Sequence, residues 1–269
     1  MPGRIGRALE RAGREHRGAF VPFLTSGFPD TVESDRLALA LCEEGADVLE
    51  LGIPFSDPLA DGPVIQRTTE AALRAGTTVA HVLGQALRIR ARHETALVLM
   101  SYLNPILRHG ADAFARDAAE AGVDGVLIVD LPPEEEPALW DGFRAARLDT
   151  IAMVSPTTDP DRLPAIERRA RGYLYVIARL GVTGVGTADP AIAAALRALR
   201  ERTQLPRCLG FGFGLASDLS PYRGEAEGII VGSALLTAIL EGRDAAEREA
   251  RARAFARTFR GRLEGWDAA

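Results

Sequence analysis

The chain has 269 residues, of which 47% are hydrophobic and 26% are charged, a composition that is typical of a soluble globular protein and excludes fibrous and disordered classes. The formal net charge is −5, and all 32 basic residues are arginine. Because the chain contains no lysine, it cannot itself supply a Schiff-base amine, a covalent link to pyridoxal phosphate or a phosphate-loop lysine.

The cysteines and histidines predict a reduced protein without a metal site. Cys42 and Cys208 lie in apolar segments and have no CxxC partner, which suits small buried residues in a reducing compartment. The four histidines are scattered without the spacing of metal ligands. We find no signal peptide and no membrane span, and the clusters of arginine are interleaved with acidic residues. We therefore expect a cytoplasmic protein that binds neither membrane nor nucleic acid.

The chain alternates short apolar runs with longer amphipathic segments. The apolar runs predict eight strands, at 19–25, 48–53, 96–101, 125–130, 149–154, 173–178, 206–211 and 228–231. Helices are predicted at 3–15, 31–44, 63–92 with a break at Gly76, 111–121, 134–147, 160–170, 190–202, 217–223 and 233–263. Eight βα units in series predict an α/β fold, a single-domain (β/α)₈ TIM barrel over residues 1–269 with an extra N-terminal helix.

A repeated phrase supports this architecture. A helix end, a glycine, a small residue and an acid precede a strand at Gly45-Ala46-Asp47 and again at Gly122-Val123-Asp124, with a weaker copy that ends at Glu227. The glycine suits a helix C-cap, and the acid follows in the loop to the next strand. The phrase indicates repeated βα units rather than a repeated function.

Glu50 is the first candidate for a catalytic group. Alternate side chains of a strand share a face, so Glu50 points into the barrel if Leu49 and Leu51 pack on the helices. A carboxyl among apolar neighbours has a raised pKa, which suits proton transfer near neutrality. The alternative is a structural glutamate that is satisfied by backbone groups or an internal arginine.

The loop after this strand, from Pro54 to Pro63, contains two acids, Asp57 and Asp61. Barrels of this kind carry their active sites in such loops, at the carboxyl ends of the strands. The alternative is that Asp61 only caps the helix that begins at Pro63.

Glycine-rich segments follow the last three strands, at 181–186, 210–214 and 232–233. Glycine permits close approach of the backbone, and helix N-termini present free N–H groups to anions. Because loops after strands 7 and 8 of barrels often bind phosphate, these segments predict a phosphorylated substrate.

Several strings together resemble the tryptophan synthase alpha-subunit family over nearly the whole chain. They are FVPFLTSGFPD at 20–30, GADVLELGIPFSDPLADGPVIQ at 45–66, YLNPIL at 102–107, GVDGVLIVDLPPEE at 122–135, GYLYVIARLGVTG at 172–184, and GFGF and VGSA near the end. The resemblance implies a lyase that cleaves indole-3-glycerol phosphate to indole and glyceraldehyde 3-phosphate without a cofactor or metal of its own. By position, Glu50 matches the general acid and base, and Asp61 matches the carboxylate that accepts the indole N–H.

The resemblance also implies substrate-binding and partner-binding residues. The matched substrate-binding residues are Phe23, Leu127 and Tyr175 at the indole pocket, Thr183 and Gly184 in a closing loop, and Gly212, Gly232 and Ser233 at the phosphate. The implied partner is a beta subunit that holds pyridoxal phosphate and receives indole, in an expected α₂β₂ complex. Asp57, Pro58, Asn104 and Pro132 match the surface that contacts it.

Three departures from the family pattern leave details open. Two GFG patterns overlap in 210–214, so the sequence does not decide which glycines meet the phosphate. Residues 185–187 lack the polar or basic residue of many relatives, and Met153 replaces a branched aliphatic residue. Two alternative functions also stay open, namely a stand-alone lyase that releases free indole and a non-catalytic scaffold for a beta subunit.

Overall fold

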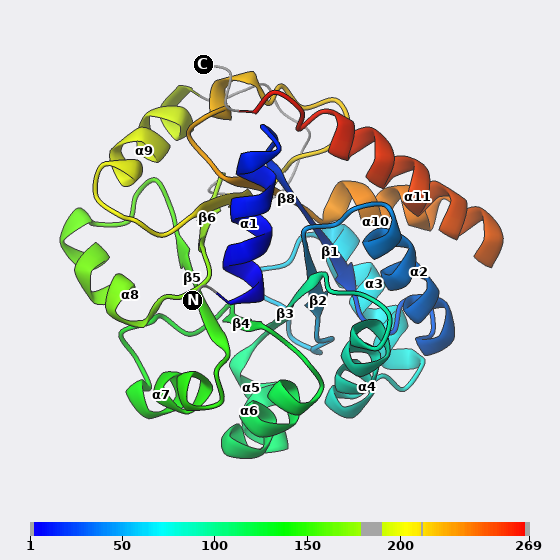
Figure 1. Cartoon of the computed structure of the whole chain (residues 1–269). Helices are drawn as coiled ribbons and strands as arrows, with labels where there is room; N and C mark the ends of the chain where they lie inside the picture. The colour runs from blue at the N-terminus through cyan, green and yellow to red at the C-terminus, as the bar shows by residue number, and fades with distance from the viewer. Residues whose placement is uncertain (1–2, 179–189, 211, 267–269) are drawn as a thin grey trace.

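The predicted barrel is confirmed by a computed structural model, which describes residues 3–178, 190–210 and 212–266. Eight parallel strands pair in sequence order, and β8 returns to pair with β1, so that the sheet closes. The helices surround the strands, while α1 lies across one end of the barrel (Figure 1). This end is closed by Ile5 of α1, which lies directly against Gly125 at the start of β4.

The strands match the predicted segments within one or two residues at each end. They are β1 (Ala19–Thr25), β2 (Val48–Gly52), β3 (Ala96–Ser101), β4 (Gly125–Ile128), β5 (Asp149–Val154), β6 (Leu174–Ile177), β7 (Arg207–Gly210) and β8 (Gly228–Val231).

The helices required more correction than the strands. They are α1 (Arg4–Arg14), α2 (Thr31–Glu43), α3 (Pro63–Arg74), α4 (Val79–Arg90), α5 (Leu103–His109), α6 (Ala111–Glu120), α7 (Pro137–Ala145), α8 (Leu163–Arg169), α9 (Pro190–Arg200), α10 (Ser233–Leu240) and α11 (Ala245–Gly261), with 3₁₀ turns η1 (Pro160–Arg162) and η2 (Ser220–Tyr222).

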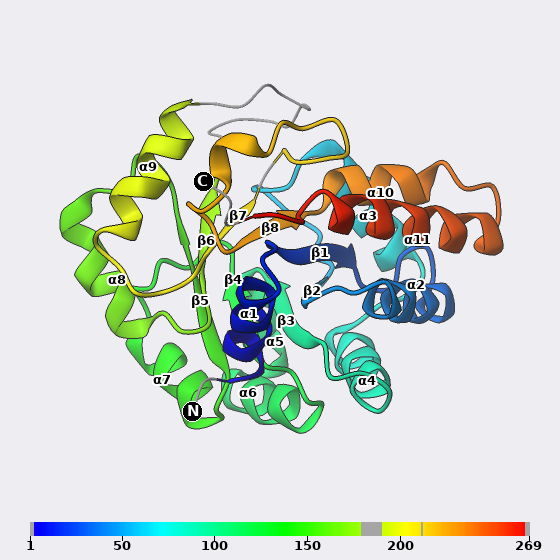
Figure 2. The same ribbon diagram turned by 45° about the horizontal axis from the view of Figure 1, so that its top comes forward.

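The single helix predicted at 233–263 is wrong. The chain turns after α10, and Asp244 begins α11 by accepting the N–H of Glu247 at 2.8 Å. The two helices then lie side by side against the barrel (Figure 2). Helix α5 was not predicted; it contains Pro105, which is tolerated in the first turn of a helix.

Acidic residues at the amino ends of the strands join neighbouring strands. Asp47, just before β2, accepts the N–H of Phe20 in β1 at 2.9 Å and pairs with the buried Arg17. Asp124 accepts the N–H of Leu97 at 2.8 Å, and Glu227 accepts that of Arg207 at 2.6 Å. These three acids, which we call the strand clamps, are the acids of the repeated sequence phrase.

No helix in the described ranges combines the length and the apolar character that crossing a membrane requires. The same ranges contain no group of three or more histidine, cysteine, aspartate or glutamate residues able to hold a metal ion.

Candidate active site

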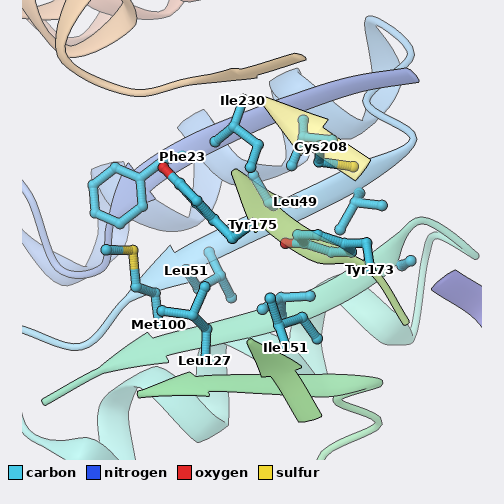
Figure 3. Packing of buried hydrophobic residues seen from close by; sticks show 14 of the residues in the cluster. Phe23, Leu49, Leu51, Met100, Leu127, Ile151, Tyr173, Tyr175, Cys208 and Ile230 are labelled. Atoms are coloured by element: carbon cyan, nitrogen blue, oxygen red, sulfur yellow. The ribbon is translucent and has the colours of Figure 1, made fainter. Parts of the chain in front are cut away.

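Glu50 lies inside the barrel, as the alternation of side chains in its strand predicts. Its carboxyl is fully buried, and the hydroxyl of Tyr173 donates a hydrogen bond of 2.5 Å to Oε1. Since Tyr173 directly precedes β6, which is not a neighbour of β2, this bond crosses the barrel interior. Figure 3 shows Tyr173 and Tyr175 projecting from the same strand into the core.

The environment of Glu50 prepares it for proton transfer. Burial raises the pKa of its carboxyl to about 7, and the hydrogen bond from Tyr173 acts in the opposite direction. The second carboxyl oxygen, Oε2, has no hydrogen-bond partner among the described residues. A glutamate with a purely structural role would normally have both oxygens hydrogen-bonded, so the unpartnered Oε2 favours a chemical role for Glu50. Glu50 is, however, not among the residues that line the two cavities at the carboxyl ends of the strands.

Asp61 lies in the loop between β2 and α3 and is not the cap of that helix. Helix α3 begins after Gly62, and no side chain caps it. The Asp61 carboxyl is partly buried, and burial raises its pKa to about 6, while a hydrogen bond with Tyr102 lowers it. The sequence had left capping open as the alternative, and the structure does not support it.

Two adjoining cavities lie at the carboxyl ends of the strands. The empty space, including the part that opens to solvent, is about 280 Å³ in one and about 520 Å³ in the other, and Phe23, Asp61, Ile65 and Met100 line both. The larger cavity is also lined by Tyr175, Gly212, Phe213, Ile230, Gly232 and Ser233. In Figure 3, Phe23, Met100 and Tyr175 lie around one space from three different strands.

The glycines of this region fit large side chains or turns. A Cβ atom on Gly210 would lie 2.4 Å from the hydroxyl oxygen of Tyr175, so a glycine is needed for that ring to fit. Gly212 has a φ of +93°, a conformation that favours glycine. Gly232 precedes α10, and Ser233 is the first residue of that helix, at the edge of the cavity.

The remaining predicted site residues lie in several places. Leu127 of β4 is buried between Met100 and Ile151 in the strand register and does not line either cavity. Thr183 and Gly184 lie outside the described residues. Asp57, Asn104 and Pro132 are exposed and Pro58 is half-buried, on loops and a helix start at the carboxyl ends of β2, β3 and β4.

Sequence reasoning missed two tyrosines in contact with the candidate carboxyls. Tyr173 was available as a signal, because it stands two residues before Tyr175 and therefore shares its face of the strand. Tyr102 had no comparable signal, since its contact with the distant loop at Ala60 depends on how β3 ends.

A TIM barrel that buries one carboxyl of raised pKa, Glu50, and places a second, Asp61, at a glycine-lined cavity is typical of an enzyme of acid and base chemistry. The comparisons with known proteins agree with this class. The model of the family described as tryptophan synthase alpha chain matches residues 9–263. This chain belongs to that family.

Individual relatives cover nearly all of the chain. It is 41% identical over 264 residues to the tryptophan synthase alpha chain of Burkholderia multivorans, with 97% of each chain covered. A tryptophan synthase structure from Mycobacterium tuberculosis has a TM-score of 0.89 at 35% identity and covers 98% of this chain and 99% of that one. The structure of the tryptophan synthase alpha subunit from Legionella pneumophila also has a TM-score of 0.89, at 36% identity, and the match covers 98% of this chain and 99% of that one.

Proposed function

We propose that the chain cleaves indole-3-glycerol phosphate to indole and glyceraldehyde 3-phosphate at this site. The observation that carries the proposal is that Glu50 and Asp61, both with raised pKa values, both lie close enough to Tyr175 to raise the pKa of its hydroxyl. Asp61 and Tyr175 also line the larger cavity. Glu50 is fully buried deeper in the barrel, near Tyr175 of the cavity wall. A retro-aldol cleavage requires acid and base groups near one another.

Glu50 carries the proton transfers in this proposal. A proton is added to C3 of the indole ring, and the side-chain hydroxyl next to the breaking bond loses its proton. The electron pair of the carbon–carbon bond returns to the ring, which leaves as indole, and the hydroxyl carbon becomes the aldehyde. A carboxyl whose pKa is about 7 is suited to both transfers near neutral pH.

Asp61 stabilises the charge that these transfers create. Protonation of C3 places positive charge on the ring, and part of this charge lies on the ring N–H. A carboxylate that accepts a hydrogen bond from this N–H therefore stabilises the protonated ring. The phosphate of the substrate is assigned to Gly212, Gly232 and Ser233, where the N-terminus of α10 meets the cavity. Phe23 and Tyr175 supply ring surfaces for the indole, Leu127 stands beside the cavity residue Met100 in the strand register, and Thr183 and Gly184 belong to the proposed closing loop.

The proposed partner is a beta subunit that holds pyridoxal phosphate and takes up the indole, in an α₂β₂ complex. Asp57, Pro58, Asn104 and Pro132 are the proposed contacts. The neighbouring Leu59 is 96% exposed and Leu107 is 53% exposed, as expected of apolar side chains that a partner covers.

Replacing Glu50 by Gln tests the catalytic assignment. The variant keeps the shape of the side chain but cannot exchange a proton near neutral pH, so we expect indole release to fall by roughly three orders of magnitude or more. The measurement is indole formation from indole-3-glycerol phosphate, and Glu201→Gln at an exposed position is the matched control. Full activity of Glu50→Gln would refute the assignment, and a folded but inactive wild-type chain would support a scaffold instead.

The partner is tested by the same assay with and without a beta subunit. Acceleration of indole release together with co-elution of the two chains would support the complex. Fast release that is indifferent to the beta subunit would identify a stand-alone lyase.

A further inference from the structure

Tyr102 joins the loop of Asp61 to the end of β3. It follows the last residue of that strand, it is only 6% exposed, and its ring packs on Phe55 with 5.3 Å between ring centroids. Its hydroxyl accepts the backbone N–H of Ala60 at 3.0 Å. Phe55 and Ala60 belong to the loop between β2 and α3, so the tyrosine holds this loop at two points.

The hydroxyl of Tyr102 has one hydrogen, and the bond from Ala60 does not use it. The next residue after Ala60 is Asp61, which lines the same cavity as Tyr102, and its carboxyl lies close enough to this hydroxyl for each group to shift the pKa of the other. A carboxylate can only accept, so the tyrosine is the donor when Asp61 is ionised. The Tyr102 hydroxyl thus binds the backbone of the loop at Ala60 and lies beside the Asp61 side chain.

The donor keeps its hydrogen over the whole neutral range. Burial and the negative charge of Asp61 raise the pKa of the Tyr102 phenol well above its usual value, and Asp130 acts in the same direction. Asp130 itself accepts the N–H of Leu103, the first residue of α5, at 2.8 Å. The position of Tyr102 is therefore set by the ends of two strands, β3 and β4, as well as by the loop.

We propose that Tyr102 is a positioning residue, which holds the loop at Phe55 and Ala60 and donates its hydroxyl hydrogen to the Asp61 carboxylate, so that this carboxylate is aimed at the ring nitrogen of the substrate. The inference rests on the proposed function for the identity of the substrate. The contacts of Tyr102 with Ala60 and Phe55 do not depend on that identity.

Other titratable groups also lie in this part of the site, and their titration must be distinguished from the effect of Tyr102 on Asp61. Tyr175 of β6 lies near Asp61, and Glu50 of β2 lies near Tyr175. A pH profile of the reaction therefore contains contributions from both carboxyls. The decisive measurement has to follow the carboxyl of Asp61 alone.

The first experiment compares the side-chain carboxyl titration of Asp61 by nuclear magnetic resonance in the full chain and in Tyr102→Phe. The hydrogen bond from Tyr102 lowers the pKa of Asp61, so its removal should raise that pKa. Phe55→Leu removes the ring contact but keeps the hydroxyl, and it should leave the Asp61 pKa unchanged. An Asp61 pKa that does not rise in Tyr102→Phe would overturn the proposal, whether or not the chain cleaves the substrate.

The second experiment measures the cleavage kinetics of the same variants. We expect kcat to fall roughly 10- to 100-fold in Tyr102→Phe with a much smaller change in KM, because a hydrogen bond to a charged group is lost in the transition state. In an Asp61→Asn background, the same substitution should have little further effect. Equal losses in both backgrounds would show that Tyr102 acts independently of Asp61, and would contradict the proposal. Wild-type inactivity would reject the proposed function and leave the titration as the test.

Discussion

At the residue scale, the raised pKa of Glu50 suits catalysis but lowers the stability of the fold near neutral pH. Its pKa is raised to about 7 by burial, so the folded protein holds a proton that the unfolded chain releases above its ordinary pKa of 4.5. The stability that this proton supplies is fully present below pH 4.5 and is lost as the pH rises through 7. A buried carboxyl that is useful for proton transfer therefore weakens the fold at the pH where it works.

This opposition can be measured with Glu50→Gln. The amide does not titrate, so the variant should gain stability over the wild type as the pH rises from 4.5 to 8, by up to about 3 kcal/mol. Urea unfolding at a series of pH values checks it, with Glu201→Gln as the exposed control. A stability difference that is constant with pH would show that the carboxyl does not titrate as inferred.

Single residues also show how far the sequence alone could be followed. Alternation along the strand gave the direction of Glu50, because that rule depends only on neighbouring residues. The bond from Tyr173 to Glu50 crosses the barrel, and the contact of Tyr102 depends on the path of a loop. Such contacts follow from tertiary packing, which no local pattern contains.

At the scale of elements, the strand clamps fix neighbouring strands at their amino ends. Asp47 is 1% exposed and accepts hydrogen bonds from Phe20 and from both terminal nitrogens of Arg17. The buried pair is costly to desolvate, but removing one partner leaves the other charge unpaired. The acid is therefore required wherever the arginine is buried.

We expect Asp47→Asn to lower the free energy of unfolding by about 3 kcal/mol, since it removes the charge of the buried partner of Arg17 and leaves this arginine the ion pair with the half-exposed Glu15. Asp35→Asn, in the exposed pair with Arg88, should cost below about 1 kcal/mol. Urea unfolding followed by circular dichroism compares the two. Equal effects would show that the clamp contributes no more than a surface ion pair.

The errors in the predicted helices also have physical causes. Periodicity continued from 233 to 263 because α10 and α11 both bury an apolar face, yet Gly242 and Asp244 carried the signals of a helix end and a helix start. The predicted break at Gly76 was correct, and that glycine has a φ of +80°. Strands were easier to place, since a short apolar run between turn residues is typical of a buried parallel strand.

At the scale of the whole molecule, the sheet closes only when all eight strands are present, and we infer that the chain forms one domain. The strand clamps are not evenly spread around this closed sheet. They join β1 to β2, β3 to β4 and β7 to β8, whereas the residue before β6 is Tyr173, which turns inward to Glu50. Among the described strands, β5 and β6 are thus the two that take part in no clamp.

We predict that amide hydrogens of β5 and β6 exchange faster than those of β1 to β4, because local opening is easiest where fewest interactions cross between strands. Hydrogen exchange followed by mass spectrometry of the native chain measures this. In Asp47→Asn, exchange in β1 and β2 should rise toward the rate of β5 and β6. Slowest exchange in β5 and β6 would contradict the role given to the clamps.

Arg17, the arginine that pairs with the strand clamp Asp47, has a further consequence in alkaline solution. A guanidinium keeps its charge above pH 12, whereas an ammonium in its place would begin to lose it near pH 10. The phenols of Tyr173 and Tyr175 and the thiol of Cys208 are buried, and their pKa values are raised well above the ordinary ones. Unfolding releases their protons in base, so we expect these buried neutral groups to destabilise the fold in alkaline solution before its arginine ion pairs lose their charge.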